Sequence, residues 1–269
     1  MKGELLAIDG DSLAHRAYHA LPKSIRLNAV VGFSNFLLRL WEAEAPRAIL
    51  VAWDTLSVPT YRHEALAVYQ SGREFEDSIV DQLDLLPQIV EAMGFAIAKG
   101  AGYEADDFLA AAAATQPTPI LVATSDRDAF QLVRDGVTIL QPVKGVSELA
   151  RIDVAGVRER YDCEPEQVPD LIALRGDPSD KIPGAKGVGP KTAASLLKQY
   201  GSLEAALDDG RFSQQADDLR LYKRSATMDA SAPLPERGDQ EPTWGRAAAL
   251  AEEWGLGNLA KRLGERNSD

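Results

Sequence analysis

The segment Gly102-Tyr103-Glu104-Ala105-Asp106-Asp107-Phe108-Leu109-Ala110 places three carboxylates at the start of an apolar, alanine-rich helix. Acids beside a hydrophobic face cost free energy unless a cation lies among them. Glu104 and Asp107 are three residues apart and share one side of the first helical turn, whereas Asp106 points to another side. First-turn acids also help a helix to begin, because its N-terminus carries a partial positive charge. From this segment alone, a helix-starting role and a divalent-metal site both remain open.

Three short apolar runs elsewhere in the chain each lead into an aspartate. Leu5–Ile8 leads into Asp9, Ala48–Trp53 into Asp54, and Ile120–Ser125 into Asp126. Helix-length segments separate these runs, a pattern typical of parallel strands that are buried on both faces and joined by crossover helices. Because ligands bind at the carboxyl edge of open α/β sheets, we expect the three aspartates to converge on one crevice. One such aspartate alone would more often cap a turn.

More acidic residues follow in the second half of the chain. Asp128 lies two residues after Asp126, and Asp177 and Asp180 are three apart within Arg175–Lys181. Taken alone, the Asp-Pro pattern there is ordinary turn chemistry. Beside the other acids it indicates further ligands, and ligands made only of oxygen suit Mg²⁺ or Mn²⁺ better than zinc. Nine ionised carboxylates in one crevice would require at least two such ions, ~3.5 to 4 Å apart.

A glycine-rich stretch comes next, Ile182-Pro183-Gly184-Ala185-Lys186-Gly187-Val188-Gly189-Pro190-Lys191-Thr192. Gly187 and Gly189 permit a tight turn, and the proline that follows suits the first turn of a helix. Amides at that helix N-terminus, reinforced by Lys186 and Lys191, are expected to hold a nucleic-acid backbone without reading its bases. The simpler interpretation is a helix–turn–helix connection whose glycines only cap helices.

The composition describes a folded protein. The chain has 269 residues, 45% of them apolar, which allows one large domain or two ordinary ones. No apolar run approaches the ~20 residues of a membrane span and no signal-peptide pattern appears, so we expect a cytoplasmic protein with no membrane partner. The single cysteine, Cys163, is expected to be a small buried side chain. The net charge of −12 disfavours a phosphate partner, but removing the nine candidate ligands from the 41 acids leaves 32 against 29 bases.

Together these motifs resemble the 5′-nuclease, or flap endonuclease, superfamily, and most closely the bacterial 5′-3′ exonuclease domain of DNA polymerase I. The resemblance runs from Leu6 to about Ala206. It implies an α/β fold in which helices flank a mostly parallel central sheet, the PIN-like nuclease core. The core would span residues 1–164 and include a helical arch at 55–100. A helical DNA-binding region would occupy residues 165–269, with a helix-three-turn-helix at about 168–206.

The resemblance also assigns the site residues. It implies a metal site made of Asp9, Asp54, Glu104, Asp106, Asp107, Asp126, Asp128, Asp177 and Asp180. Among these, the last three are expected to serve a second ion. We expect Arg16 and Arg73 to bind and orient the reacting phosphate. The implied DNA contacts come from the arch and the glycine hairpin, with K⁺ at the hairpin: Arg62, Lys186, Gly187, Gly189, Lys191 and Thr192.

The implied function is that of a structure-specific 5′-nuclease, both a 5′-flap endonuclease and a 5′-3′ exonuclease, in DNA replication and repair. A two-metal mechanism would hydrolyse DNA phosphodiesters and leave 5′-phosphate and 3′-hydroxyl ends. The partners would be DNA with 5′ flaps, nicks or free 5′ ends, and we expect a monomer. No polymerase-sized segment follows, which predicts a free-standing enzyme.

Two positions depart from the family pattern. Gln70 stands where a lysine is expected in the arch, and it lacks the positive charge of a lysine. His15 replaces a tyrosine. His15 and His19 are four apart, but no third soft ligand accompanies them, so surface or DNA-facing roles are favoured over a metal site. Tyr18 and Phe33 are expected in the core.

Two alternatives come from other functional classes. A non-catalytic DNA-junction-binding protein would keep the glycine hairpin without needing the acids. A PIN-like endoribonuclease would share the strand-end acids but usually lack the hairpin. Magnesium-dependent cleavage of a 5′-flap substrate would exclude the junction-binding protein. A matched comparison of RNA with DNA would separate the endoribonuclease.

Beyond Ala206 the sequence is less informative. Residues 208–241 are charged and rich in turn residues. Apolar positions from Trp244 to Leu263 have helical spacing. We expect these last helices to pack back on the DNA-binding half.

Overall fold

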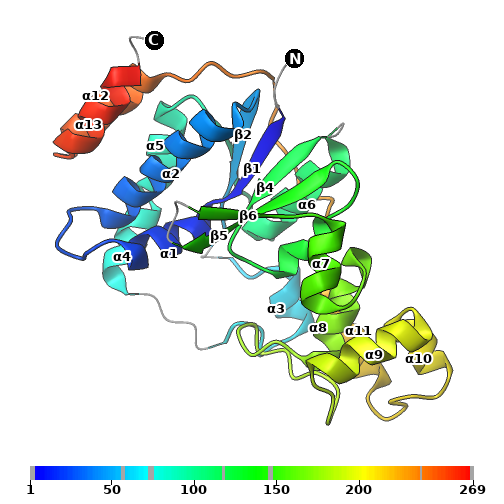
Figure 1. The fold of residues 1–269 in the computed structure, drawn as a ribbon. Helices are drawn as coiled ribbons and strands as arrows, with labels where there is room; N and C mark the ends of the chain where they lie inside the picture. Colours follow the sequence, from blue (N-terminus) through cyan, green and yellow to red (C-terminus); the bar gives the residue numbers. More distant parts are fainter. Residues whose placement is uncertain are drawn as a thin grey trace.

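One mixed sheet organises the protein (Figure 1). The computed structural model describes residues 4–55, 58–71, 76–116, 119–144, 148–236 and 238–266. Within them the strands pair in the order β3-β2-β1-β4-β5-β6, and the pairing is parallel except between β5 and β6. The strands are β1 (Leu5–Asp9), β2 (Ala48–Ala52), β3 (Ala96–Ala98), β4 (Ile120–Ala123), β5 (Val137–Lys144) and β6 (Glu148–Ile152). The mostly parallel α/β sheet predicted from the sequence is confirmed.

The strands that lead into the aspartates lie at the centre of this sheet. Every residue of β1, β2 and β4 is buried, as expected for short apolar runs that are covered on both faces. Parallel pairing sets Ile8 beside Val51 on one strand and Ala123 on the other, so the three strands end together. The aspartates at the ends of these strands therefore gather at one edge of the sheet.

Helices cover both faces of the sheet (Figure 1). Those in the described residues are α1 (Gly10–Ala20), α2 (Asn28–Glu44), α3 (Tyr61–Ala65), α4 (Asp77–Leu83), α5 (Leu86–Ala92), α6 (Ala105–Thr115), α7 (Val154–Tyr161), α8 (Val168–Arg175), α9 (Pro190–Tyr200), α10 (Leu203–Asp208), α11 (Ala216–Ala226), α12 (Trp244–Glu253) and α13 (Gly257–Glu265), with short 3-10 helices η1 (Asp128–Leu132) and η2 (Pro165–Gln167). Leu6 and Ile8 of β1 enter the core that contains α2 and α5. Leu5 and Ala7 enter the opposite core, which contains α6 and α8, as the two-residue period of a strand requires.

The helices α8, α9, α10 and α11 lie together below the sheet in Figure 1. The buried carboxylate of Asp170 on α8 forms an ion pair with Lys223 of α11 (2.6 Å). Asp170 also accepts a hydrogen bond from the backbone amide of Leu203 (3.1 Å), the first residue of α10. One carboxylate thus connects three of these helices.

The segment predicted to form the arch, residues 55–100, divides into two parts in the structure. Its C-terminal part, α5 and β3, belongs to the layers around the sheet. In the part before it, α3 contacts α11, and α4 contacts α1 and α2. Residues 56–57 and 72–75, and with them Arg73, lie outside the described residues.

The two C-terminal helices lie on the core, and the expectation that they pack back on the DNA-binding half is wrong. Trp244 of α12 is buried with its ring centroid 5.7 Å from that of Phe95 and 6.2 Å from that of Trp41. These aromatic rings form one apolar cluster beside α2 and α5, at the opposite end of the molecule from α9 (Figure 1). Large aromatic rings bury the most surface per side chain, so they determine where these helices dock.

Several smaller expectations are confirmed. Tyr18 and Phe33 are buried core residues, and Cys163 is a buried free thiol whose pKa is raised to about 11 by desolvation. Among the described residues, no helix combines the length and the apolar character that crossing a bilayer requires.

Replacing Trp244 by alanine should lower the free energy of unfolding by about 3 kcal/mol or more, because it removes a buried ring from the aromatic cluster. Chemical denaturation would measure this loss. The matched control is Val80→Ala, because Val80 is an exposed apolar residue of α4, and its loss should change stability by about 0.5 kcal/mol at most. Equal effects of the two substitutions would contradict the proposed docking of α12.

Candidate active site

An acidic crevice of about 350 Å³ opens at the carboxyl edge of β1, β2 and β4. Its walls come from the residues that follow these strands, from the start of α6 and from the loop between α8 and α9. The carboxylates that line it are Asp9, Asp11, Asp54, Glu104, Asp106, Asp126, Asp128 and Asp180. Seven of the nine predicted acids therefore share one crevice, while Asp107 and Asp177 are not part of its lining.

Asp9, at the end of β1, is held by neighbouring donors. Its Oδ1 atom accepts a hydrogen bond from the Ser12 amide (3.0 Å) and so caps α1, and its Oδ2 atom accepts one from Thr124 Oγ1 (2.7 Å). Thr124 Oγ1 in turn accepts a hydrogen bond from the Asp126 amide (3.0 Å). Burial, against the lowering effect of the hydrogen bonds from Thr124 and Ser12 and with a smaller contribution from the charges of Asp54 and Asp126, raises the pKa of Asp9 to about 7.

Asp54 joins the end of β2 to two helices. Its Oδ1 atom accepts a hydrogen bond from the amide of Ala105, the first residue of α6 (2.7 Å), and its own amide donates to Asp11 Oδ2 (2.7 Å). Asp11 was not predicted from the sequence. Burial, followed by the charge of Asp54, raises the pKa of Asp11 well above its usual value. The available signal was its position two residues after Asp9, at the start of a helix.

The start of α6 carries the three acids of the opening segment, and their helix-starting role is visible there. Asp107 Oδ2 accepts a hydrogen bond from the Glu104 amide (3.0 Å), which stabilises the first turn. Asp106 faces the crevice, whereas Asp107 is fully buried. Burial raises the pKa of Asp106 well above its usual value, and a neighbouring cation, Arg62, opposes this shift.

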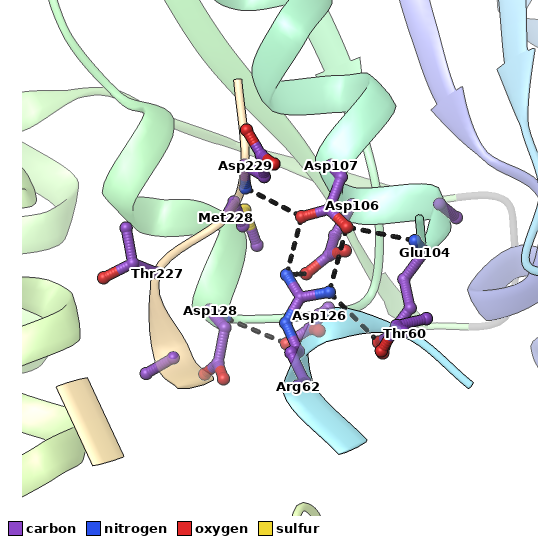
Figure 2. A network of polar contacts seen from close by, with 12 residues as sticks. Thr60, Arg62, Glu104, Asp106, Asp107, Asp126, Asp128, Thr227, Met228 and Asp229 are labelled. Atoms are coloured by element: carbon purple, nitrogen blue, oxygen red, sulfur yellow. Dashed lines mark hydrogen bonds and ion pairs between the residues drawn. The ribbon is translucent and has the colours of Figure 1, made fainter. Parts of the chain in front are cut away.

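Arg62 of α3 lies among these acids (Figure 2). Its Nη atoms are 2.8 and 3.1 Å from the two oxygens of Asp107, 2.9 Å from Asp106 Oδ2 and 3.4 Å from Glu104 Oε2. Its Nε atom donates to the Ser225 carbonyl (3.1 Å), and only 1% of the residue is exposed. The sequence predicted Arg62 as a DNA contact in the arch, whereas in this structure its charge is directed at the carboxylates.

Other residues of the segment 58–71 reach the same acids. Thr60 Oγ1 donates to Glu104 Oε1 (2.8 Å), and the Tyr69 hydroxyl donates to Glu104 Oε2 (3.1 Å). Gln70 Nε2 donates to Asp180 Oδ1 (3.1 Å), so this segment contacts both the α6 acids and the loop after α8. Thr60 and Tyr69 were not identified from the sequence, because contacts between distant segments leave no periodic signal.

An antiparallel β-bridge closes the loop after α8. Asp177 and Ile182 exchange two backbone hydrogen bonds of 2.8 Å. Gly184 has a φ of +76°, and a Cβ atom there would lie 2.5 Å from the amide nitrogen of Gly176, so only glycine fits. Asp180 lies between the two bridged residues and lines the crevice, where burial raises its pKa to about 6. Asp177 instead accepts a hydrogen bond from the Ser179 amide (2.8 Å).

Of the other residues discussed from the sequence, Arg16 and the hairpin residues lie outside the crevice lining. Arg16 Nη2 donates to the Val143 carbonyl (3.2 Å). His15 lines the crevice, whereas His19 is exposed. The hairpin before α9 and the first turn of that helix are exposed at every predicted position: Lys186, Gly187, Gly189, Lys191 and Thr192.

The crevice suits a hard divalent cation. In the described part of the chain, no three His, Cys, Asp or Glu side chains already form a metal-binding group. The lining is nevertheless rich in carboxylate oxygen, and Asp106 Oδ1 is buried without a hydrogen-bond partner. A buried orphan oxygen is costly, and a cation of this class would satisfy it.

Comparisons with known proteins agree with this geometry. The family described as "5'-3' exonuclease, N-terminal resolvase-like domain" matches residues 4–162, and "5'-3' exonuclease, C-terminal SAM fold" matches residues 163–242. A 5′-3′ exonuclease of Streptomyces coelicolor is 35% identical over 96% of this chain and 98% of its own. DNA polymerase I of Mycobacterium tuberculosis is 43% identical over 77% of this chain, but the match covers 24% of that protein, so this chain aligns with about a quarter of the polymerase.

The fold also has a close match among solved structures. A flap endonuclease of bacteriophage T5, in a pseudo-enzyme–product complex with DNA and metal ions, superposes with a TM-score of 0.71 at 17% identity. The match covers 99% of this chain and 100% of the phage protein. At this identity it establishes the fold.

Without divalent ions, stability should fall as the pH rises from about 5 to 8. The folded protein holds protons on Asp9 (pKa about 7) and Asp180 (pKa about 6) more tightly than the unfolded chain, whose pKa is 3.8, so the stabilisation disappears as the pH passes these values. Thermal denaturation in a chelator would measure the decline. Asp9→Asn should make it shallower, and a melting temperature that rises over this range would contradict the assignment.

Proposed function

The chain belongs to the 5′-3′ exonuclease family, and on that premise we propose that it is a structure-specific 5′-nuclease of DNA replication and repair. Its substrates would be DNA with 5′ flaps, nicks or free 5′ ends, hydrolysed to 5′-phosphate and 3′-hydroxyl products. We propose that it acts as a cytoplasmic monomer. The observation that carries the proposal is the convergence of carboxylates from three strand ends, from α6 and from the α8–α9 loop on one crevice.

The proposed cofactors are at least two Mg²⁺ or Mn²⁺ ions in this crevice. When bound, such ions supply a nucleophilic water at neutral pH and neutralise charge on the leaving oxygen. Asp9, Asp54, Glu104 and Asp106 would hold the ions near the sheet edge, and the side nearer α8 would use Asp126, Asp128 and Asp180. Asp106 Oδ1 is buried without a hydrogen-bond partner, which supports its role as a ligand.

The exposed hairpin before α9 is the proposed seat for the DNA backbone. The helix is 11 residues long, and its first backbone amides follow Gly189, where no side chain blocks the approach of a phosphate. Lys186 and Lys191 add positive charge there, and a K⁺ ion is proposed at the same hairpin. We propose α8 to α11 as the DNA-binding region, with α12 and α13 serving the core.

Arg16 and Arg73 are proposed to bind the reacting phosphate. A guanidinium group matches phosphate geometry with two parallel hydrogen bonds, which orients the group for in-line attack. Arg16 is half-buried on α1, the helix that begins directly after Asp9. Its guanidinium could therefore approach a phosphate bound near the end of β1.

A flap-cleavage assay tests the proposal directly. The protein should cut a 5′-flap DNA in Mg²⁺ and lose this activity in a chelator, and Asp126→Ala should lower the rate at least about 100-fold, because Asp126 lines the crevice. Glu253→Ala, at an exposed position on α12, is the control and should leave the rate unchanged. Flap binding without cleavage would instead support a junction-binding protein, and preferred cleavage of matched RNA would support an endoribonuclease.

Position 70 provides a second test. Gln70→Lys should raise the single-turnover rate several-fold, because it places a cation beside Asp180, where a phosphate would develop negative charge. Gln70→Leu is the control, since it removes the hydrogen bond to Asp180 without adding charge. An unchanged rate in the lysine variant would show that another cation already fills this role.

A further inference from the structure

We propose that Asp107 is a positioning residue and not a metal ligand: it holds Arg62 as a fixed internal cation against Glu104 and Asp106. The inference rests on the proposed nuclease function, because it concerns how the same crevice binds its ions. It also gives different roles to Asp106 and Asp107, two neighbouring residues that were both predicted as metal ligands from the sequence.

The surroundings of Asp107 leave its carboxylate no free position. Its Oδ1 atom accepts hydrogen bonds from Arg62 Nη2 (2.8 Å) and the Asp229 amide (2.8 Å). Its Oδ2 atom accepts from Arg62 Nη1 (3.1 Å) and the Glu104 amide (3.0 Å). An ionised carboxylate offers about four lone-pair sites, so these four donors saturate it. Asp107 is also 0% exposed and does not line the crevice.

Asp106 differs although it is the next residue. It lines the crevice, its Oδ2 atom accepts from Arg62 Nη2 (2.9 Å), and its Oδ1 atom is buried without a partner. Consecutive residues of a helix point about 100° apart, so one aspartate faces the protein and the other faces the crevice. Figure 2 shows contacts from the Arg62 guanidinium to both carboxylates.

Arg62 is fixed in place by its other contacts. Its Nε atom donates to the Ser225 carbonyl (3.1 Å), and its guanidinium carbon lies 4.8 Å from the centre of the Tyr61 ring. Two parallel hydrogen bonds to Asp107 add the geometry in which a guanidinium binds most strongly. The charge that remains is directed at Asp106 and at Glu104 Oε2, 3.4 Å away.

This arrangement explains how the acids at the start of α6 are tolerated before any ion binds. Asp107 neutralises one unit of charge in a buried pair, and Arg62 lowers the repulsion between Glu104 and Asp106 at the crevice wall. Removing Arg62 and Asp107 together therefore leaves the local net charge unchanged and removes no ligand. Removing Arg62 and Asp106 together also leaves the local net charge unchanged, but it removes a proposed ligand.

Two charge-matched double variants of the full chain test the proposal, R62M/D107N and R62M/D106N. Isothermal titration calorimetry with Mn²⁺ alone would measure the number of bound ions and their dissociation constants. We expect R62M/D107N to bind as many ions as the unmodified protein, with dissociation constants within about threefold, and R62M/D106N to lose an ion or bind at least about tenfold more weakly.

An equal loss of Mn²⁺ binding in both double variants would overturn the proposal, as would a larger loss in R62M/D107N. If R62M/D107N fails to fold, the single variant Asp107→Asn decides, because it keeps Arg62 paired with Asp106 and Glu104. It should bind the full number of ions, and one ion fewer would overturn the proposal. The readout is metal binding, so a failure here is distinct from absence of flap cleavage, which would refute the nuclease function itself.

Discussion

A single buried guanidinium facing three carboxylates is the interaction on which the crevice depends. The charges at the start of α6 cannot remain ionised in a buried position without a compensating cation, and Arg62 provides one from a segment more than forty residues earlier in the chain. The sequence suggested that only divalent ions could make such crowding tolerable. In the structure the chain supplies part of the compensation itself, and burial and mutual repulsion raise the pKa values of other crevice acids.

The acids of the crevice, and the buried Asp107 next to them, also stabilise the starts of helices. Asp9 caps α1, Asp54 accepts a hydrogen bond from the first amide of α6, and Asp107 stabilises the turn that begins at Glu104. Each contact satisfies a backbone amide that would otherwise lack a partner at a helix start. Asp54 caps α6 with one carboxylate oxygen and also lines the crevice, so helix capping is compatible with the proposed ion binding there.

The parts of the site that the sequence predicted are those with a local signal. Short apolar runs ending in aspartate predicted β1, β2 and β4 and placed Asp9, Asp54 and Asp126 at one edge, because parallel register aligns strand ends. The inward position of Arg62 had no such signal, since it arises from contacts between α3, α6 and Ser225 of α11. The docking of α12 was missed for the same reason: its helical period was visible, but the partner of Trp244 was not.

The β-bridge between Asp177 and Ile182 lies between the crevice and the proposed DNA-binding hairpin in the chain. Gly176 and Gly184 approach too closely for any side chain, so the loop that carries Asp180 is closed at its base. The exposed hairpin with Lys186 and Gly187 begins immediately after this closure, and α9 continues from it. A DNA phosphate bound at the start of α9 would therefore lie at a nearly fixed distance from the acids. The reason is that few residues separate the two, and among them the backbones of Gly176 and Gly184 are packed closely together. This rigidity would let a site that grips DNA without reading its bases still define where along the strand the crevice acts.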